Sequence, residues 1–124
     1  MKILKELTKA EEQIMKVLWR LKKGSIKEVS KEMTEPKPAY NTIATVLKVL
    51  NTKGFVAYDV DGSTFAYFPL VAERDYRHFA FDKVLSRYFN NSYQSLLSFL
   101  AEEKDIDPQA QENLMRLAEK LKGK

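Results

Sequence analysis

Residues 39–68 decide the fold, and they read AYNTIATVLKVLNTKGFVAYDVDGSTFAYF. Apolar residues recur at helical spacing through the first half of this stretch, which predicts a helix over residues 39–53. The second half is rich in aromatic and β-branched residues at 55–60 and 63–68, and these two runs flank Asp61-Gly62. This dipeptide predicts a two-residue hairpin turn in which both central positions take a positive φ. A helix therefore passes directly into a β-hairpin.

Two further helices are expected before this stretch. Thr8-x-x-Glu11 and Ser25-x-x-Glu28 both have the spacing of a capping box, in which two side chains satisfy free N–H groups at a helix start. The first helix is expected to end at Gly24 and the second at Pro36. Three helices followed by a hairpin is the plan of a winged helix-turn-helix. We therefore expect residues 1–72 to form a winged-helix DNA-binding domain.

After the hairpin the pattern is helical again through a C-terminal region, residues 73–124. Asn90-Asn91-Ser92 and Asp107-Pro108 interrupt it, so three helices are expected there. The chain as a whole is therefore expected to be mainly α-helical with one small β-hairpin.

This C-terminal region carries many large apolar side chains but is too short to enclose a stable core alone. A second copy of the chain is the expected cover, because most soluble oligomers are two-fold homodimers. The alternative is that the region folds back onto the N-terminal domain of its own chain. The residues expected to form the dimerisation surface are Tyr76, Phe79, Val84, Leu85, Tyr88, Leu96, Leu97, Leu100, Leu114, Leu117 and Leu121.

The composition excludes several classes of site. The 124 residues include no cysteine, so disulfides, thiolate metal sites and cysteine nucleophiles are excluded. His78 is the only histidine, and the carboxylates do not have the spacing of a calcium loop, so neither a metal nor another cofactor is expected. Without a glycine-rich phosphate loop as well, the chain is not expected to be an enzyme. No apolar run approaches the ~20 residues of a membrane span, so we expect a cytoplasmic protein without membrane insertion.

The net charge of +4 is unevenly distributed. Residues 1–54 carry 12 lysines and arginines against 6 acidic residues, and the remainder of the chain is net acidic. A basic N-terminal half suits attraction to the phosphates of double-stranded DNA. The alternative is that these lysines only solvate helix faces.

The outward face of the helix at 39–53 holds the candidate DNA-binding residues. In a helix-turn-helix the N-terminal residues of this helix approach base edges in the major groove. Asparagine can pair with adenine, threonine can contact a base or a thymine methyl, and lysine suits a phosphate. The alternative is that the polar residues at the helix start serve as caps and that the tyrosine belongs to the core. The candidates are Tyr40, Asn41, Thr42, Thr45 and Lys48.

The hairpin is less typical of a DNA-contacting wing. Its tip, residues 59–63, carries two aspartates, and Ser63 and Thr64 are its only expected donors to phosphate. The acidic tip favours a second hypothesis, in which the winged helix contacts protein without binding specific DNA. The basic N-terminal half opposes that hypothesis.

Four motifs resemble the penicillinase-repressor family, the BlaI, MecI and CopY type of bacterial transcriptional regulator. Together they cover nearly the whole chain. They are Leu7-Thr8-x-Ala10-Glu11-x-x-Ile14-Met15-x-x-Leu18-Trp19, Ala39-Tyr40-x-Thr42-Ile43-x-Thr45, Lys53-Gly54-Phe55 and Gly62-x-x-Phe65-x-Tyr67-x-Pro69-Leu70-Val71.

The resemblance implies a homodimer that binds a pseudo-palindromic operator and represses transcription until a signal removes it. In well-known members a membrane sensor protease acts indirectly, and the repressor is cut in its dimerisation part, commonly between Asn and Phe. Residues 95–100 read SLLSFL here and contain no such pair. Whether this chain is released from DNA by the same proteolytic route is therefore left open. Copper-responsive relatives use a cysteine cluster that this chain lacks. Some relatives carry a basic residue where Ala44 stands, so their operator preference does not transfer.

Overall fold

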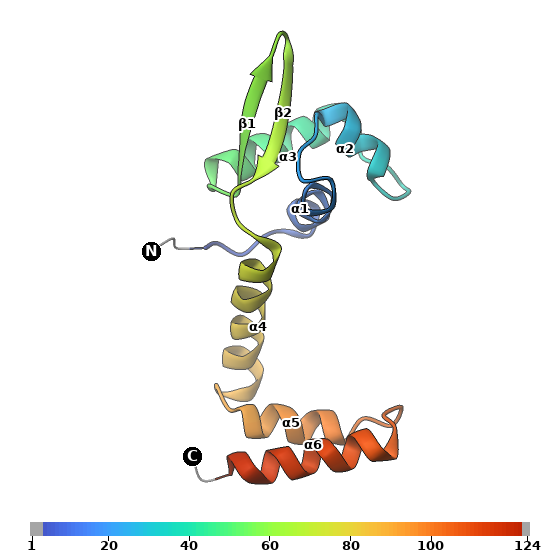
Figure 1. Ribbon diagram of the computed structural model, residues 1–124, viewed down its shortest axis with the longest axis vertical. Helices are drawn as coiled ribbons and strands as arrows, with labels where there is room; N and C mark the ends of the chain where they lie inside the picture. The colour runs from blue at the N-terminus through green and yellow to red at the C-terminus, as the bar shows by residue number, and fades with distance from the viewer. Residues whose placement is uncertain (1–3, 123–124) are drawn as a thin grey trace. The chain divides into compact units, whose positions relative to one another are not determined.

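The computed structural model describes residues 4–122, which form two compact units that divide after Arg77 (Figure 1). In the described residues, six helices and one two-stranded antiparallel sheet confirm the expected mainly helical fold. The division lies within the fourth helix, whereas the sequence places a domain boundary before it, at residue 72.

Helix α1 (Lys9–Leu21) begins with the predicted capping box. The Thr8 hydroxyl accepts the backbone N–H of Glu11 at 3.2 Å, and a Glu11 carboxylate oxygen accepts the backbone N–H of Thr8 at 2.9 Å. The last helical residue is Leu21, and the C-cap residue Lys22 has a positive φ of 72°, so the helix ends before the predicted Gly24. Gly24 has another role: its N–H and carbonyl pair with the backbone of Tyr67 at 2.9 and 2.7 Å. This bridge joins the loop after α1 to the hairpin.

The next two helices form the helix-turn-helix. Helix α2 (Ile26–Glu32) has the second predicted capping box, between Ser25 and Glu28. It ends ahead of Pro36 because Met33 turns to extended backbone, with ψ at 146°, and buries its side chain. Helix α3 (Tyr40–Thr52) lies within one residue of its predicted bounds at both ends.

The hairpin comprises β1 (Val56–Asp61) and β2 (Thr64–Pro69), each shifted one residue from the prediction. Asp61 pairs with Thr64, so the central turn residues are Gly62 and Ser63 rather than Asp61 and Gly62. Of these two, only Gly62 has a positive φ, at 65°. When glycine is the first of the two central residues, only that residue needs a positive φ, whereas the predicted turn needs a positive φ at both positions. The predicted turn is therefore wrong by one position.

The core of the N-terminal unit lies between the three helices and the hairpin. Its inner side chains are almost completely shielded from solvent, and burial of this kind is the main favourable term in folding. The largest fully buried side chains of the described residues all belong to this unit: Ile14, Met15, Leu18, Val29, Ile43, Leu47, Leu50, Phe55 and Val56.

Tyr76, in the first turn of α4 (Glu73–Phe89), closes this core. Its ring lies 6.1 Å from that of Trp19 and 5.8 Å from that of Phe55, and its hydroxyl accepts the backbone N–H of Leu7 at 3.0 Å. The Trp19 indole donates to the carbonyl of Val71 at 2.9 Å. Only 6% of Tyr76 is exposed, so this residue serves the core of its own unit instead of the dimerisation surface expected for it.

The C-terminal unit contains the rest of α4, then α5 (Tyr93–Ala101) and α6 (Pro108–Leu121). The predicted break follows α4, where Asn90 and Asn91 both take positive φ and the Ser92 hydroxyl accepts the N–H of Ser95. Helices α5 and α6 lie side by side (Figure 1), and Gln111 donates to the carbonyl of Ala101 at 2.6 Å. Among the described residues, no helix is both long and apolar enough to cross a membrane.

Candidate nucleic-acid interface

All five candidate DNA-binding residues lie exposed on α3 or at its start. Tyr40 is 58% exposed, so the alternative that it belongs to the core is wrong. The N-cap residue is Ala39, which makes no side-chain cap, so the capping alternative for the polar residues that follow it is wrong as well. The structure brings together on one surface Tyr40, Asn41, Thr42, Thr45 and Lys48.

The opposite face of α3 anchors this surface. Ile43, Leu47 and Leu50 are fully buried, and the Asn51 amide donates to the carbonyl of Val56 at 2.9 Å, across the junction with the hairpin. Preorganised support of this kind fixes the direction in which the outward side chains point.

Two outward residues differ in what they can offer a ligand. The Thr45 hydroxyl donates to the carbonyl of Asn41 at 2.9 Å, within the helix. Lys48 is exposed and makes no ion pair among residues 4–122, so its ammonium group is available for a phosphate.

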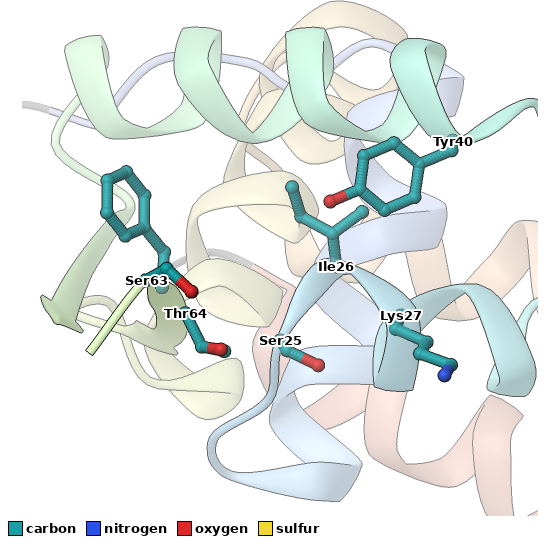
Figure 2. A pocket seen from close by; sticks show the side chains of 7 residues that line it. Ser25, Ile26, Lys27, Tyr40, Ser63 and Thr64 are labelled. Atoms are coloured by element: carbon teal, nitrogen blue, oxygen red, sulfur yellow. The ribbon is translucent and has the colours of Figure 1, made fainter. Parts of the chain in front are cut away.

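A hollow of about 660 Å³ adjoins the start of α3 (Figure 2). The Tyr40 ring leans from α3 toward Ile26, with its hydroxyl directed into the hollow. The start of α2 and the beginning of β2 form the other sides, so that three separate elements meet there. Hydroxyl groups and one ammonium group predominate among its polar groups, and these are donors to phosphate oxygens. The lining residues are Ser25, Ile26, Lys27, Tyr40, Ser63, Thr64 and Phe65.

A second hollow, of about 330 Å³, lies between α3 and the hairpin. Ala44, Thr45 and Lys48 line its helix side, and the aromatic rings of the hairpin line the other. The rings of Tyr58 and Phe65 are stacked with their centroids 4.9 Å apart. This hollow is therefore mainly apolar on its hairpin side.

One aspartate of the wing is neutralised by a lysine. Asp59 forms an ion pair with Lys23, whose ammonium group also lies 5.6 Å from the centre of the Phe68 ring. Asp61 makes no such pair among the described residues. The wing is thus less acidic than its sequence suggests. Sequence reasoning missed this pair because the two residues are far apart along the chain.

A largely buried ion pair ties α1 to the end of α3. Lys53 donates to Glu11 at 2.7 Å, and Glu11 is only 5% exposed. Burial raises the pKa of the Glu11 carboxyl, but the hydrogen bonds from Lys53 and Thr8 outweigh it, and the pKa lies below the ordinary value of 4.5. The sequence indicated only the capping role of Glu11.

Tyr67 lies beneath the second hollow and is 7% exposed. Burial, together with the nearby phenols of Tyr58 and Tyr40, raises the pKa of its hydroxyl above the ordinary value of 10. The hydroxyl is therefore neutral at physiological pH.

The residues expected for dimerisation differ widely in exposure. Leu85, like Tyr76, is buried within a single chain, whereas Val84, Tyr88, Leu100 and Leu117 are exposed. Partly buried are Phe79, Leu96, Leu97, Leu114 and Leu121. Four further apolar side chains of this unit are exposed but were not among the residues expected for dimerisation, although all are large residues on predicted helices: Phe81, Tyr93, Phe99 and Met115.

Comparisons with known proteins agree with this fold and surface. The sequence profile of the penicillinase repressor family matches residues 7–120. The penicillinase repressor of Bacillus licheniformis is 27% identical over 125 aligned residues, which cover 100% of this chain and 98% of that protein. The methicillin resistance regulatory protein MecI of Staphylococcus aureus (strain N315) is 26% identical over 116 residues, covering 93% and 94%.

Among solved structures, the solution structure of the DNA binding domain of the repressor BlaI is similar, with a TM-score of 0.53 and 34% identity. The match covers 61% of this chain and 94% of that domain. The predicted winged-helix fold is confirmed.

Proposed function

Since the chain belongs to the penicillinase repressor family, we propose that it represses transcription as a homodimer that occupies a pseudo-palindromic DNA operator. The family and the matched relatives are named for repression and DNA binding, so the chain is a transcriptional repressor and not an enzyme. The specific operator, the dimer and a cytoplasmic location are the parts that we propose.

One observation supports sequence-specific binding above all. The outward face of α3 is mainly polar and exposed, its polar side chains are not used to cap the helix, and its inner face is buried. We infer that α3 enters the major groove with Asn41 at a base edge and Lys48 at a phosphate. Lys27, Tyr40, Ser63 and Thr64, around the larger hollow, are proposed as donors to the adjoining phosphates.

The exposed apolar side chains of the C-terminal unit support the homodimer. Eight large ones are exposed among the described residues of this unit, and exposed apolar side chains that adjoin one another mark surfaces that contact other proteins. Two-fold pairing would cover equivalent patches on both chains. Pairing would also link two DNA-binding domains, each of which contacts one half of the operator, so that the dimer binds the operator more tightly than either domain alone.

A sensor protease that acts indirectly is a further part of the proposal. Residues 95–100 lie within α5, and Phe99 is 51% exposed. A protease needs extended backbone, so cleavage there requires α5 to open first. Incubation of the protein with cell extract, followed by mass spectrometry of the fragments, tests this. A cut near Phe99 supports the route, and an intact chain under inducing conditions contradicts it.

Fluorescence anisotropy with labelled duplexes tests DNA binding. The full chain should bind the region upstream of its own gene at least a hundredfold more tightly than unrelated DNA of equal length. Equal affinity for the two duplexes would contradict sequence-specific repression.

Two substitutions separate base contacts from phosphate contacts. Asn41→Ala should reduce the preference for the specific duplex by at least fivefold, through loss of a base contact. Lys27→Ala should weaken binding to both duplexes and lower the steepness of the salt dependence. Lys120→Ala on α6 is the matched control and should change neither quantity. Binding that is insensitive to salt would favour the winged helix as a protein-contact domain.

A further inference from the structure

The outward face of α3 carries two adjacent methyl groups whose role the proposed function leaves open. We propose that Ala44 and Thr45 recognise the 5-methyl group of a thymine in the major groove. This inference rests on the proposed function, since it names the base feature that the same surface reads.

The hydrogen bond of Thr45 limits what that residue can read. A threonine hydroxyl has one hydrogen, and here it is donated to the carbonyl of Asn41 at 2.9 Å. Donation to a base acceptor, such as guanine O6 or thymine O4, would break that bond. What Thr45 can present without rearrangement is its methyl group and the lone pairs of its oxygen.

Ala44 extends the apolar spot. It is partly exposed and lines the smaller hollow beside Ile26, Tyr58 and Phe65. The only apolar group that a base pair displays in the major groove is the thymine methyl. A small methyl-bearing side chain in apolar surroundings therefore suits thymine better than it suits any acceptor or donor.

Asn41 fixes where this thymine should lie. Asn41 precedes Thr45 by four residues, slightly more than one helical turn, or about 6 Å along the axis. Base pairs are spaced about 3.4 Å apart, so an adenine paired with Asn41 and the thymine should be one or two steps apart. The expected half-site thus contains an adenine and a thymine in close succession.

Selection of duplexes from a random-sequence pool with the full-length protein, followed by replacement of each thymine with deoxyuracil, tests this directly. Deoxyuracil lacks only the 5-methyl group. Replacement of the recognised thymine in one half-site should raise the dissociation constant about fourfold, which corresponds to the burial of one methyl group. Replacement in both half-sites together should raise it about fifteenfold.

Two matched variants identify the residue responsible. Thr45→Ser keeps the hydroxyl that bonds to Asn41 and removes only the methyl group, so it should lose most of the discrimination between thymine and deoxyuracil. Thr52→Ser is the control, because Thr52 makes the same kind of bond, to the carbonyl of Lys48 at 3.2 Å, near the far end of the helix. This control should discriminate as the unaltered protein does.

The outcomes distinguish the inference from the function on which it rests. If the selection enriches no sequence, sequence-specific binding itself is contradicted. If a site is enriched but no deoxyuracil substitution changes affinity by more than about 1.5-fold, the proposed function stands and the methyl-reading inference is overturned. Retention of full discrimination by Thr45→Ser would also overturn the role of Thr45. The deoxyuracil series uses the unaltered protein, so its result does not depend on the folding of any variant.

Discussion

The two units of the chain differ in how they handle apolar side chains. Among the described residues of the N-terminal unit, nine large side chains are fully buried. Among the described residues of the C-terminal unit, the buried apolar residues are Leu85, Ala101 and Ala118, while eight large apolar side chains are exposed, against six in the longer N-terminal unit. The N-terminal unit therefore has a core of its own, and the C-terminal unit has the exposed apolar surface that we propose a second copy covers.

The largest effect is expected from the core of the N-terminal unit. Leu47→Ala should lower the free energy of unfolding by about 2–5 kcal/mol, because a fully buried side chain leaves a cavity. Val49→Ala, on the exposed face of the same helix, is the control and should change it by about 0.5 kcal/mol or less. Urea unfolding followed by circular dichroism measures both, and equal effects would contradict the described orientation of α3.

The buried ion pair comes next. Lys53→Met should cost about 1.5–3 kcal/mol at neutral pH, because Glu11 loses a charged hydrogen-bond partner. Since the folded-state pKa of Glu11 lies below its ordinary value, the pair stabilises the fold above that value and the benefit is lost as the pH falls through the lowered pKa. Unfolding curves at pH 7 and pH 3 should therefore show the difference from the unaltered protein shrinking in acid.

The control for this pair is Lys16→Met, which breaks the exposed pair with Glu12 on α1. Its effect should be about 0.5 kcal/mol or less, because surface ion pairs contribute little. A cost for Lys53→Met that is equally large at pH 3 would show that packing, and not charge, explains the contact.

In the C-terminal unit, substitution of an exposed apolar residue should affect association more than folding. Leu117→Glu should weaken the proposed dimer about tenfold, because it places a charge on the exposed apolar surface that we propose pairing covers. Asn113→Glu, at an exposed polar position of the same helix, should leave dimerisation unchanged. Sedimentation equilibrium measures the association, and an unaltered dimer of Leu117→Glu would place the interface elsewhere.

The smallest effect is expected at Tyr76. Tyr76→Phe keeps the ring contacts with Trp19 and Phe55 and removes the hydroxyl that accepts the N–H of Leu7, at a cost of about 1 kcal/mol. Tyr88→Phe, at a position that is 74% exposed, should be neutral. Thermal unfolding of the two variants provides the comparison. A neutral Tyr76→Phe would mean that water replaces the lost hydroxyl.

Local signals in the sequence predicted most of the fold. Capping boxes and helical periodicity involve residues within one or two turns, so both N-terminal capping boxes and the bounds of α3 could be found without a structure. The turn of the hairpin was wrong by one position, because Gly62 can serve as either central residue and the register is decided by strand pairing.

Contacts between distant residues could not be predicted in this way. The pairs Lys53–Glu11 and Lys23–Asp59 join different elements, and nothing in the spacing of these residues along the chain indicates them. The same holds for Tyr76, whose helical periodicity suggested an outer surface although it packs against Trp19. The candidate DNA-binding residues were easier to find, because the outward face of a helix follows from its buried face.

Amide hydrogen exchange of the full chain at several protein concentrations tests the contrast between the two units most directly. Protection of α1 to α3 and of the hairpin should be independent of concentration, since their core is supplied by one chain. Protection of residues 78–122 should rise with concentration, because dimerisation stabilises the structure that pairs. Protection in the C-terminal unit that is equally strong at the lowest concentrations, where the protein is monomeric, would contradict the need for a second copy.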